Sequence, residues 1–375
     1  MNCVFLGLSI TSTWGNGHAT TYRGLLKELA KRGHSVTFLE RDVPWYSANR
    51  EFSNVSYCTI RLYHSLEELR DKYTALVRTA DIVVVGSYVP DGVAVGRWVT
   101  STAKNCTAFY DIDTPVTLEN LRRSRCEYLA YDLVDKYNIY FSFTGGPTLK
   151  FIERELGSPR ARALYCSVDP SLYYPQKTQK KNWNLGYIGT YAADRQPALE
   201  KLLLDVARQK PEARFAVAGP QYPADIAWPP NVERMDHLAA RDHCNFYNSQ
   251  KFTLNVTRRD MVRAGYSPSV RLFEAAACGV PILSDKWAGL ETFFKPLTEI
   301  LPVGTTDQVA SYLLMTDEQR EQVAENARHR VLRFHTAAVR AEEFESAVTD
   351  TAEQLVCEKK RSRAAVRQSA TAALI

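Results

Sequence analysis

The first half of the chain alternates short apolar runs with amphipathic segments. Residues 3–10 are mostly apolar, and after a polar glycine loop the leucines of residues 22–32 recur at helical spacing. Gly33 ends this predicted helix, and a strand at residues 35–39 follows directly. A strand–helix–strand unit of this kind predicts a parallel sheet covered by helices on both faces. Further apolar runs, each ending in a polar or glycine loop, predict strands at residues 81–86, 106–110 and 139–143.

The alternation stops at residues 166–182, a polar run with two prolines that predicts a linker. The alternation restarts afterwards, so the second half repeats the strand and helix pattern of the first. The expected strands lie at residues 183–190, 213–218, near Val232, 252–256, 280–283 and 300–303, and expected helices at 197–209 and about 317–348. At 375 residues the chain is long enough for two cores, and we expect two doubly wound, Rossmann-like α/β domains.

These patterns set the expected domain boundaries. The first Rossmann-like domain takes residues 1–165, the linker 166–182 and the second Rossmann-like domain 183–335. A helix at 336–350 precedes a basic tail at 351–375, which holds much of the net charge of +5. We interpret the tail as a solvated end. Contact with an anionic membrane surface or nucleic acid is the alternative, although no aromatic residues interleave the charges.

Composition limits the class of protein further. Hydrophobic residues make up 45% and charged residues 24%, which is ordinary for a soluble globular protein. None of the eight cysteines forms a Cys-x-x-Cys pair, so free thiols in a reducing compartment explain them better than disulfides or a metal site. The N-terminus is unlike a signal peptide, and no apolar run approaches the roughly 20 residues that span a membrane. We predict a cytoplasmic protein with at most peripheral membrane contact.

The most informative segment is the run from Ser267 to Asp285. Ser267 can cap a helix, Pro268 suits its first turn, and Gly279 and Pro281 close it before a buried strand. The start of such a helix offers unpaired amide hydrogens and a partial positive charge. A diphosphate can bind there without a metal ion.

Arg271 and Glu274 lie one turn apart on this helix. The arginine can meet phosphate oxygens while the carboxylate accepts hydrogen bonds from both ribose hydroxyls of a nucleotide. The alternative is that the two side chains simply pair with each other on the helix surface.

The linker Val168-Asp169-Pro170 and the Glu-x-x-x-Cys-Gly-x-Pro run that starts at Glu274 resemble glycosyltransferases of the GT-B fold, especially their glycogen-synthase-like and CgeB-like branches. The resemblance covers about residues 1–350. It implies two domains facing across a cleft, with the acceptor on the first domain, a nucleotide-sugar donor on the second, and a final helix that crosses back. It also implies that Glu274 holds the ribose and that Ser267, Ser269 and Val270 face the phosphates.

One departure concerns Tyr266, which stands where the glycogen-synthase-like branch has an acidic residue that contacts the donor sugar. The CgeB-like branch therefore fits better. The run from Gly189 to Arg195 also resembles that branch. Arg195 is then a phosphate or base contact, the alternative being a surface ion pair. Arg258 follows a buried strand and is expected to balance diphosphate charge, unless an acidic partner or water satisfies it.

The loop after the first strand holds the first candidate for a general base. Gly15 and Gly17, on either side of Asn16, allow a tight turn, and His18 is expected at the start of the following helix. An imidazole can accept a hydroxyl proton near neutral pH. The alternative is a histidine that caps the helix. The loop falls one glycine short of a Gly-x-Gly-x-x-Gly fingerprint, which argues against an NAD enzyme.

Asp111 and Asp113 form the rival base site, because period-two spacing at a strand end lets both face the same side. Asp113 can instead cap the helix that follows, and we expect one aspartate to be structural and the other to touch ligand. Thr144, Gly145 and Gly146 open another helix after a strand. Their amides can receive an anion or a sugar hydroxyl on the acceptor side, although loop geometry alone also explains the glycines.

The sequence therefore predicts a glycosyltransferase that moves a sugar from a nucleoside-diphosphate-sugar donor to an acceptor hydroxyl. We expect no cofactor and no bound metal, since a helix start and arginines can stabilise the leaving diphosphate. Carbohydrate, lipid-linked, protein and small-molecule acceptors all fit, and no nucleic-acid partner is expected. The alternatives are a nucleotide-sugar epimerase or hydrolase of the same fold and a non-catalytic sugar-nucleotide or glycan-binding protein.

Overall fold

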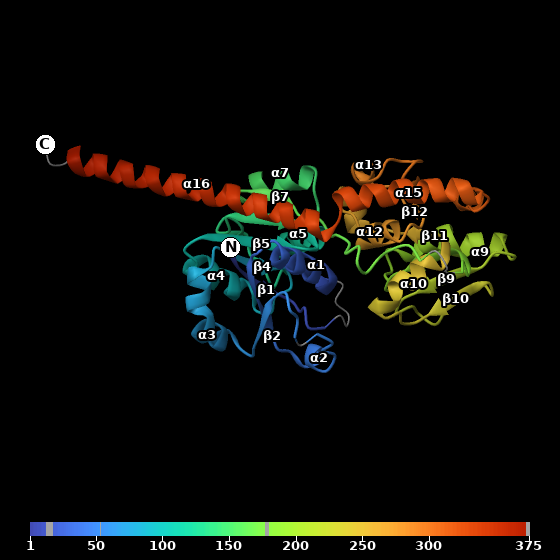
Figure 1. Cartoon of the computed structure of the whole chain (residues 1–375), viewed down its shortest axis with the longest axis horizontal. Coiled ribbons are helices and arrows are strands. Elements are labelled where there is room, and N and C mark those ends of the chain that lie inside the picture. Colours follow the sequence, from blue (N-terminus) through green and yellow to red (C-terminus); the bar gives the residue numbers. More distant parts are fainter. Residues whose placement is uncertain (13–17, 53, 177–179, 373–375) are drawn as a thin grey trace. The chain divides into compact units, whose positions relative to one another are not determined.

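The computed structural model describes residues 1–12, 18–52, 54–176 and 180–372, and the chain divides into two compact units (Figure 1). Unit 1 comprises residues 1–142, 149–164 and 340–375. Unit 2 comprises residues 143–148 and 165–339. The last helix therefore belongs to the same unit as the N-terminus, and the short segment 143–148 belongs to unit 2.

A parallel sheet forms the centre of unit 1, in the strand order β3-β2-β1-β4-β5-β6-β7. Strand β4 is buried along its whole length, because helices cover both faces of a sheet of this type. This explains why its strands read as continuous apolar runs. The strands are β1 (Asn2–Gly7), β2 (Ser35–Arg41), β3 (Thr59–Tyr63), β4 (Ile82–Gly86), β5 (Cys106–Asp111), β6 (Ile139–Ser142) and β7 (Ala161–Ala163).

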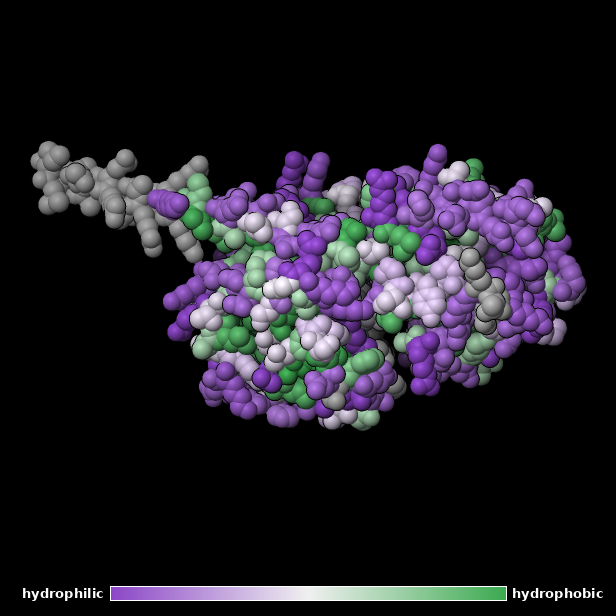
Figure 2. Space-filling view, in the orientation of Figure 1, coloured by the Kyte–Doolittle hydropathy of each residue, from purple (hydrophilic) through white to green (hydrophobic). Residues whose placement is uncertain are grey.

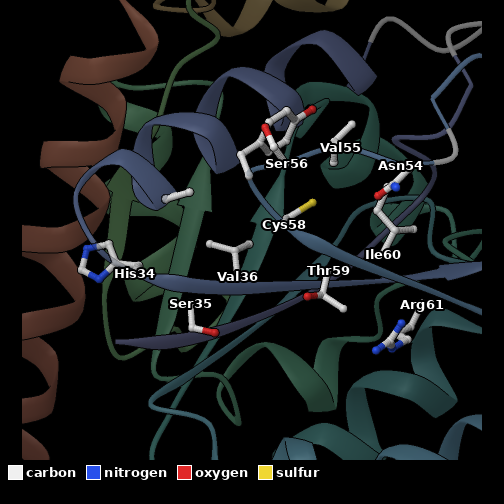
Figure 3. Close-up of a pocket in the computed structure, with 12 residues that line it drawn as sticks. His34, Ser35, Val36, Asn54, Val55, Ser56, Cys58, Thr59, Ile60 and Arg61 are labelled. Carbon is white, nitrogen blue, oxygen red and sulfur yellow. The ribbon is translucent and has the colours of Figure 1, made fainter.

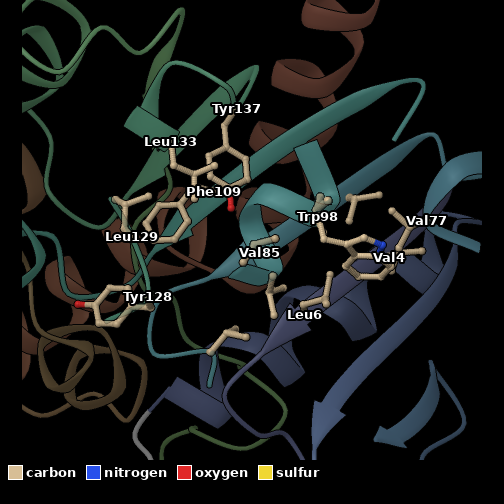
Figure 4. Close-up of a cluster of buried hydrophobic side chains, with 14 of the residues drawn as sticks. Val4, Leu6, Val77, Val85, Trp98, Phe109, Tyr128, Leu129, Leu133 and Tyr137 are labelled. Atoms are coloured by element: carbon tan, nitrogen blue, oxygen red, sulfur yellow. The ribbon is translucent and has the colours of Figure 1, made fainter. Parts of the chain in front are cut away.

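The helices between these strands pack their apolar faces on the sheet. They are α1 (His18–Lys31), α2 (Pro44–Ser47), α3 (Leu66–Thr79), α4 (Gly92–Thr102), α5 (Thr114–Arg122), α6 (Tyr131–Val134) and α7 (Pro147–Arg154). Figure 4 shows one side of the resulting core, where Trp98 of α4 and Val77 of α3 lie with Leu6 of β1 and Val85 of β4. Fully burying a side chain of this size contributes roughly 1.5–3 kcal/mol, so this layer holds the carboxyl ends of the strands in place.

The last helix, α16 (Ala337–Ala372), packs its first half against unit 1 and continues beyond it (Figure 1). The Phe344 ring lies 5.7 Å from that of Phe5 and 5.3 Å from that of Phe141. Arg32 forms a 2.6 Å ion pair with Glu345. The segment expected as a basic tail is helical as far as Ala372, so it extends α16 rather than forming a separate region.

Unit 2 holds a second parallel sheet, in the order β10-β9-β8-β11-β12-β13. Its core includes Leu185, Phe215, Leu254 and Leu283, one from each of four central strands. The strands are β8 (Trp183–Ile188), β9 (Phe215–Ala218), β10 (Val232–Met235), β11 (Gln250–Asn255), β12 (Ile282–Ser284) and β13 (Leu301–Pro302). Both sheets thus have the predicted doubly wound form.

Helices and helical turns connect the strands of unit 2. They are α8 (Gln196–Leu199), η1 (Glu200–Leu204), α9 (Asp205–Gln209), η2 (Ala240–Asp242), α10 (His243–Asn248), α11 (Arg259–Ala264), α12 (Val270–Ala277), α13 (Leu290–Phe293), α14 (Thr306–Tyr312) and α15 (Asp317–Phe334). The helical end expected at 317–348 consists of α15 and the first part of α16, with a break at His335 and Thr336. The break follows from backbone pairing, because the amide of Val168 donates to His335 and the amide of Ala337 donates to Val168.

Hydrophilic side chains cover most of the face shown in Figure 2, and in unit 1 apolar side chains gather over the region of β2. Within the described residues, no helix combines the length and the apolar character needed to cross a membrane.

Candidate functional site

The strand order of unit 2 reverses at β8, which pairs with β9 on one side and with β11 on the other. Open parallel sheets bind ligands at the carboxyl ends of the strands at such a point. The loop after β8 carries Arg195, and the loop after β11 carries Arg258. A hydrogen bond from the amide of Arg259 to Asp194, 2.8 Å long, joins the two loops. The predicted arginines therefore come from the two strands that flank the reversal.

Arg195 is partly buried and lacks an acidic partner in the part of the chain that the structure describes. Its Nη2 donates to the carbonyl of Thr190 at 2.5 Å, and its Nε is buried without a hydrogen-bond partner there. Burial lowers the pKa of Arg195, and the positive charges of Arg271 and Arg258 lower it further. The alternative of an ion pair with Asp194 or Glu200 is thus not what the structure shows. Three arginines whose positive charges repel one another favour the binding of an anion.

Arg271, on the first turn of α12, is 8% exposed and oriented by the protein itself. Its Nε donates to the carbonyl of Ile188 at 2.6 Å, and its Nη1 donates to Asn255 at 2.9 Å. The guanidinium carbon lies 4.9 Å from the centre of the Tyr187 ring, a cation–π distance. The expected alternative, an ion pair between Arg271 and Glu274, is absent among the described residues.

The start of α12 lies in the same network. The Ser269 hydroxyl donates to Asn255 at 2.8 Å instead of capping the helix, so Asn255 holds both Ser269 and Arg271. The first amides of a helix, here those of Val270 and Arg271, have no partner within the helix and point out of its end. Ser267 is 2% exposed, and its hydroxyl lies 3.0 Å from that of Thr144. Ser267 therefore fixes the backbone of this segment.

Asp285, after β12, supports the loop that carries Arg258. Its carboxylate accepts hydrogen bonds from the amide and the hydroxyl of Thr257, each 2.8 Å long. Burial raises the pKa of Asp285, and these two bonds counteract part of that effect. The pair fixes the path of the chain between β11 and Arg258.

Glu274 is 6% exposed and accepts a 3.0 Å hydrogen bond from the hydroxyl of Tyr247 on α10. The carboxylate is therefore held in one orientation by a neutral partner. A neutral donor leaves the negative charge and the remaining lone pairs of the carboxylate available for further hydrogen bonds.

In unit 1 the strand order reverses at β1, between β2 and β4. His18 begins α1 after β1, and its ring centre lies 5.5 Å from that of Tyr88, which follows β4. The Tyr88 hydroxyl donates to Asp113 at 2.9 Å. His18, Tyr88 and Asp113 therefore form a continuous group at the carboxyl ends of β1, β4 and β5.

Asp111 differs from Asp113 in its surroundings. It is fully buried, and its carboxylate accepts hydrogen bonds from Tyr140 at 2.5 Å and from Thr117 at 2.7 Å. Burial raises the pKa of Asp111 to about 6. Asp113 is 8% exposed and sits before α5 without capping it through its side chain. The hydrogen bonds of Asp111 give it a structural role, whereas the Asp113 side chain lies nearer the surface.

The loop at 144–146 is not where the sequence places it. Thr144, Gly145 and Gly146 belong to unit 2, not to the predicted acceptor domain. The Gly145 amide donates to the carbonyl of Tyr266 at 2.9 Å, so it is not open to an anion. A side chain at Gly146 would meet the Tyr266 ring at 2.4 Å, which explains the glycine by packing. Sequence position alone could not show that this loop packs on a segment more than 100 residues away.

Residues 195–346 match a protein family described as glycosyl transferase-like. This span holds Arg195, Arg258, Arg271 and Glu274. The chain has the GT-B fold, and its residues 195–346 are glycosyl transferase-like. No curated protein sequence matches it.

Solved structures agree on the fold of the chain. Sucrose-phosphate synthase from Thermosynechococcus elongatus is 14% identical, with a TM-score of 0.69 over 96% of this chain and 100% of that chain. The Anabaena protein HepE, in complex with UDP and glucose, is 12% identical, with a TM-score of 0.70 over 93% and 100%. An α-glucosyltransferase in complex with UDP-glucose and DNA is 16% identical, with a TM-score of 0.66 over 92% and 98%. The predicted fold is confirmed, and the CgeB-like branch stays a prediction.

Some expected site residues lie outside the described residues, namely Gly15, Asn16 and Gly17. In the ranges that are described, no cluster of three or more His, Cys, Asp or Glu side chains could hold a metal ion.

A hollow of about 630 Å³ in unit 1 lies away from these groups (Figure 3). It is lined by His34, Ser35 and Val36 at the start of β2 and by Thr59, Ile60 and Arg61 at the start of β3, with residues 54–58 between. These are the amino ends of the strands. Ligands of open α/β sheets bind at the carboxyl ends, so this hollow is not the expected acceptor site.

Three supporting residues were not foreseen from sequence: Tyr88, Asn255 and Glu40. Glu40 is fully buried at the end of β2 and accepts hydrogen bonds from the Ser9 hydroxyl at 2.9 Å and the Ile10 amide at 2.7 Å, which fixes the start of the loop before His18. Their common signal is a polar residue at the end of a buried strand, the place where parallel sheets keep their functional groups.

Proposed function

We propose that this glycosyltransferase takes its sugar from a UDP-sugar and transfers it to an acceptor hydroxyl, with the diphosphate held by protein cations rather than by a metal ion. UDP is the nucleotide in two of the similar structures, HepE and the α-glucosyltransferase. The observation that carries the proposal is Arg195, a partly buried arginine whose Nε has no partner among the described residues and whose charge is opposed by Arg258 and Arg271.

Breaking the bond between sugar and diphosphate leaves negative charge on the diphosphate oxygens. Donors that are already oriented stabilise this charge without reorganising during the reaction. Arg271 is oriented by Ile188 and Asn255, and the amides at the start of α12 lie on the same segment. Arg195 and Arg258 add charge from the neighbouring loops. Together these groups replace the role that a divalent cation has in metal-dependent transferases.

Glu274 is proposed to accept hydrogen bonds from the ribose hydroxyls of the nucleotide. It lies one turn after Arg271 on α12, so a nucleotide whose phosphates meet the helix start has its ribose within reach. The hydrogen bond from Tyr247 fixes the carboxylate in advance.

His18 is proposed as the general base that removes the proton of the acceptor hydroxyl. It stands at the start of α1, with Tyr88 and Asp113 as the polar groups linked to it on neighbouring strand ends. Asp113 is the alternative base, and Asp111 is proposed to support it, since the Asp113 amide donates to Asp111 at 3.3 Å. The acceptor is proposed to be a neutral hydroxyl compound, because the group contains no cluster of arginines.

All eight cysteines are free thiols in the structure. This supports the proposal that the enzyme works in a reducing compartment such as the cytoplasm.

The proposal is tested by the thermal stability of the purified protein with UDP, GDP, dTDP, ADP, CMP and their sugars, with NAD as the control. A ligand of the folded state raises the melting temperature. We expect UDP and UDP-sugars to raise it and NAD to leave it unchanged. No shift with any nucleotide would contradict the proposal. Rapid release of UDP from a UDP-sugar without an acceptor would instead indicate a hydrolase or epimerase.

A further inference from the structure

Two cysteine sulfurs meet in the core of unit 2. The Sγ atoms of Cys244 on α10 and Cys278, the last residue of the α12 turn, are 3.9 Å apart. Both are free, and Cys244 is 7% and Cys278 1% exposed. A disulfide needs sulfurs about 2 Å apart, so a movement of roughly 2 Å would join them.

The pair lies directly beside the contact that orients Glu274. Tyr247 follows Cys244 by one turn of α10, and Glu274 precedes Cys278 by one turn of α12. The 3.9 Å sulfur contact and the 3.0 Å Tyr247–Glu274 hydrogen bond therefore join the same two helices at adjacent turns. A displacement at the sulfur contact must therefore shift the Tyr247–Glu274 hydrogen bond, because close-packed interiors transmit small displacements.

We propose that Cys244 and Cys278 are a site of reversible oxidative modification, at which a peroxide converts the two thiols into a disulfide and displaces Glu274. The modification itself is independent of the function proposed above, whereas its effect on nucleotide binding rests on that function.

Cys244 is the residue that reacts first. A hydrogen bond from the Cys278 thiol lowers the pKa of Cys244 to about 6, and the same contact raises the pKa of Cys278. The side-chain amide of Asn248 also points to the Cys244 sulfur, at 3.5 Å. The thiolate is the reactive form of cysteine, and Cys244 is the more exposed of the two.

The chemistry balances with hydrogen peroxide as oxidant. The Cys244 thiolate attacks one peroxide oxygen, the O–O bond breaks, and Cys244 becomes a sulfenic acid as hydroxide leaves. The Cys278 sulfur then attacks the Cys244 sulfur, and the sulfenic oxygen leaves as water with the Cys278 proton. Two thiols are oxidised by two electrons, and one peroxide is reduced to two waters. A dithiol reductant reverses the step.

The test uses the full chain with the exposed Cys357 changed to Ser, so that intermolecular disulfides do not interfere. The protein is treated with hydrogen peroxide, unfolded and alkylated, and its peptides are analysed by mass spectrometry. We expect a Cys244–Cys278 cross-link, the loss of both thiols from alkylation, and their recovery with dithiothreitol.

Two variants on this background make the result specific. Cys278→Ala is expected to abolish the cross-link, whereas Cys106→Ala, a change at an equally buried cysteine of unit 1, is expected to leave it intact. Two alkylatable thiols at Cys244 and Cys278 after peroxide treatment of the parent protein would overturn the proposal. So would a disulfide that joins Cys244 to a cysteine other than Cys278 in the parent protein.

The effect on the site is measured as UDP affinity in the reduced and oxidised parent protein. We expect oxidation to weaken UDP binding about tenfold, which corresponds to one hydrogen bond to a charged group. Equal affinity in both states would overturn the displacement of Glu274. If the reduced protein binds no nucleotide at all, the proposed function fails, and cross-link mapping still decides whether the disulfide forms.

Discussion

The two sheets share a topology, but the charges at their reversal points are opposite in kind. In unit 2 the strand ends gather Arg195, Arg258 and Arg271. In unit 1 they gather His18, Tyr88 and the carboxylates of Asp111 and Asp113. We propose that the same fold prepares one unit for an anion and the other for an acceptor hydroxyl that must lose a proton. Function follows from these side chains, not from the topology.

The buried charges of the two units also differ in how they are satisfied. Glu40 in unit 1 accepts hydrogen bonds from the hydroxyls of Ser9 and Thr11 and from the amide of Ile10. Arg195 in unit 2 keeps a buried Nε without a partner among the described residues. A satisfied buried charge supports the fold, whereas an unsatisfied one costs free energy until a ligand arrives. This contrast underlies the proposal that Arg195 binds ligand, whereas Glu40 supports the fold.

The largest expected effect comes from a substitution in unit 1. His18→Ala should lower turnover by roughly 10²- to 10⁴-fold, the usual contribution of a general base, and should leave UDP affinity unchanged. The measurement is steady-state sugar transfer alongside calorimetric UDP binding. His64→Ala, a change at an exposed histidine of the same unit, is the control. A His18→Ala variant with at least half the turnover of the parent enzyme would leave Asp113 as the base.

Asp111 is expected to make stability depend on pH. Its folded pKa of about 6 is above the ordinary value of 3.8, so the folded protein retains a proton that the unfolded chain loses. Stability should therefore fall by about 3 kcal/mol as pH rises from 4 to 6 and stay level above that. Asp111→Asn should remove this dependence in urea unfolding, and the exposed Asp132→Asn should keep it. An identical slope in Asp111→Asn would show that another group is responsible.

Arg195→Met should weaken UDP binding about tenfold to a hundredfold, because it removes a charge-assisted contact with the diphosphate. The melting temperature without ligand should change little, since the variant also removes a repelling charge. Calorimetric titration with UDP and with uridine measures how much affinity the variant loses for each ligand. Arg208→Met, at an arginine paired with Glu200, should bind UDP like the parent enzyme. Equal losses for UDP and uridine would place Arg195 away from the diphosphate.

Glu274→Gln should weaken UDP binding about tenfold, because an amide is a poorer acceptor for ribose hydroxyls than a carboxylate. Binding of 2′-deoxy-UDP should be weakened less by the same change. Tyr247→Phe, which frees the carboxylate without removing it, should have a smaller effect. Unchanged UDP affinity in Glu274→Gln would assign Glu274 a role in packing α10 against α12.

Much of the fold could be predicted from sequence because buried parallel strands are short apolar runs. Strand β4, for example, reads Ile-Val-Val-Val-Gly and is buried throughout. Strand β3 was not predicted, because its Arg61 and its half-exposed pattern resemble a loop. The break at His335 and Thr336 lies where the helix at 336–350 was expected to begin, but its cause could not be predicted. It depends on pairing with Val168, a contact between residues far apart in the chain.

The candidate site was predicted less evenly. Residues after the strands of unit 2, such as Arg195 and Arg258, could be found because strand ends line the binding edge of an α/β sheet. The burial of Asp111 could not be distinguished from that of Asp113, since spacing gives direction but not depth. Thr144 and Gly145 were assigned to the wrong unit, because their partners Ser267 and Tyr266 are remote in sequence.

The most direct test of the central claim is calorimetric titration of UDP into the protein, once with Mg²⁺ and once with EDTA. If arginines and the start of α12 hold the diphosphate, UDP binds with the same affinity in both conditions and much more tightly than uridine. Binding of UDP that requires Mg²⁺, or equal binding of UDP and uridine, would contradict the account.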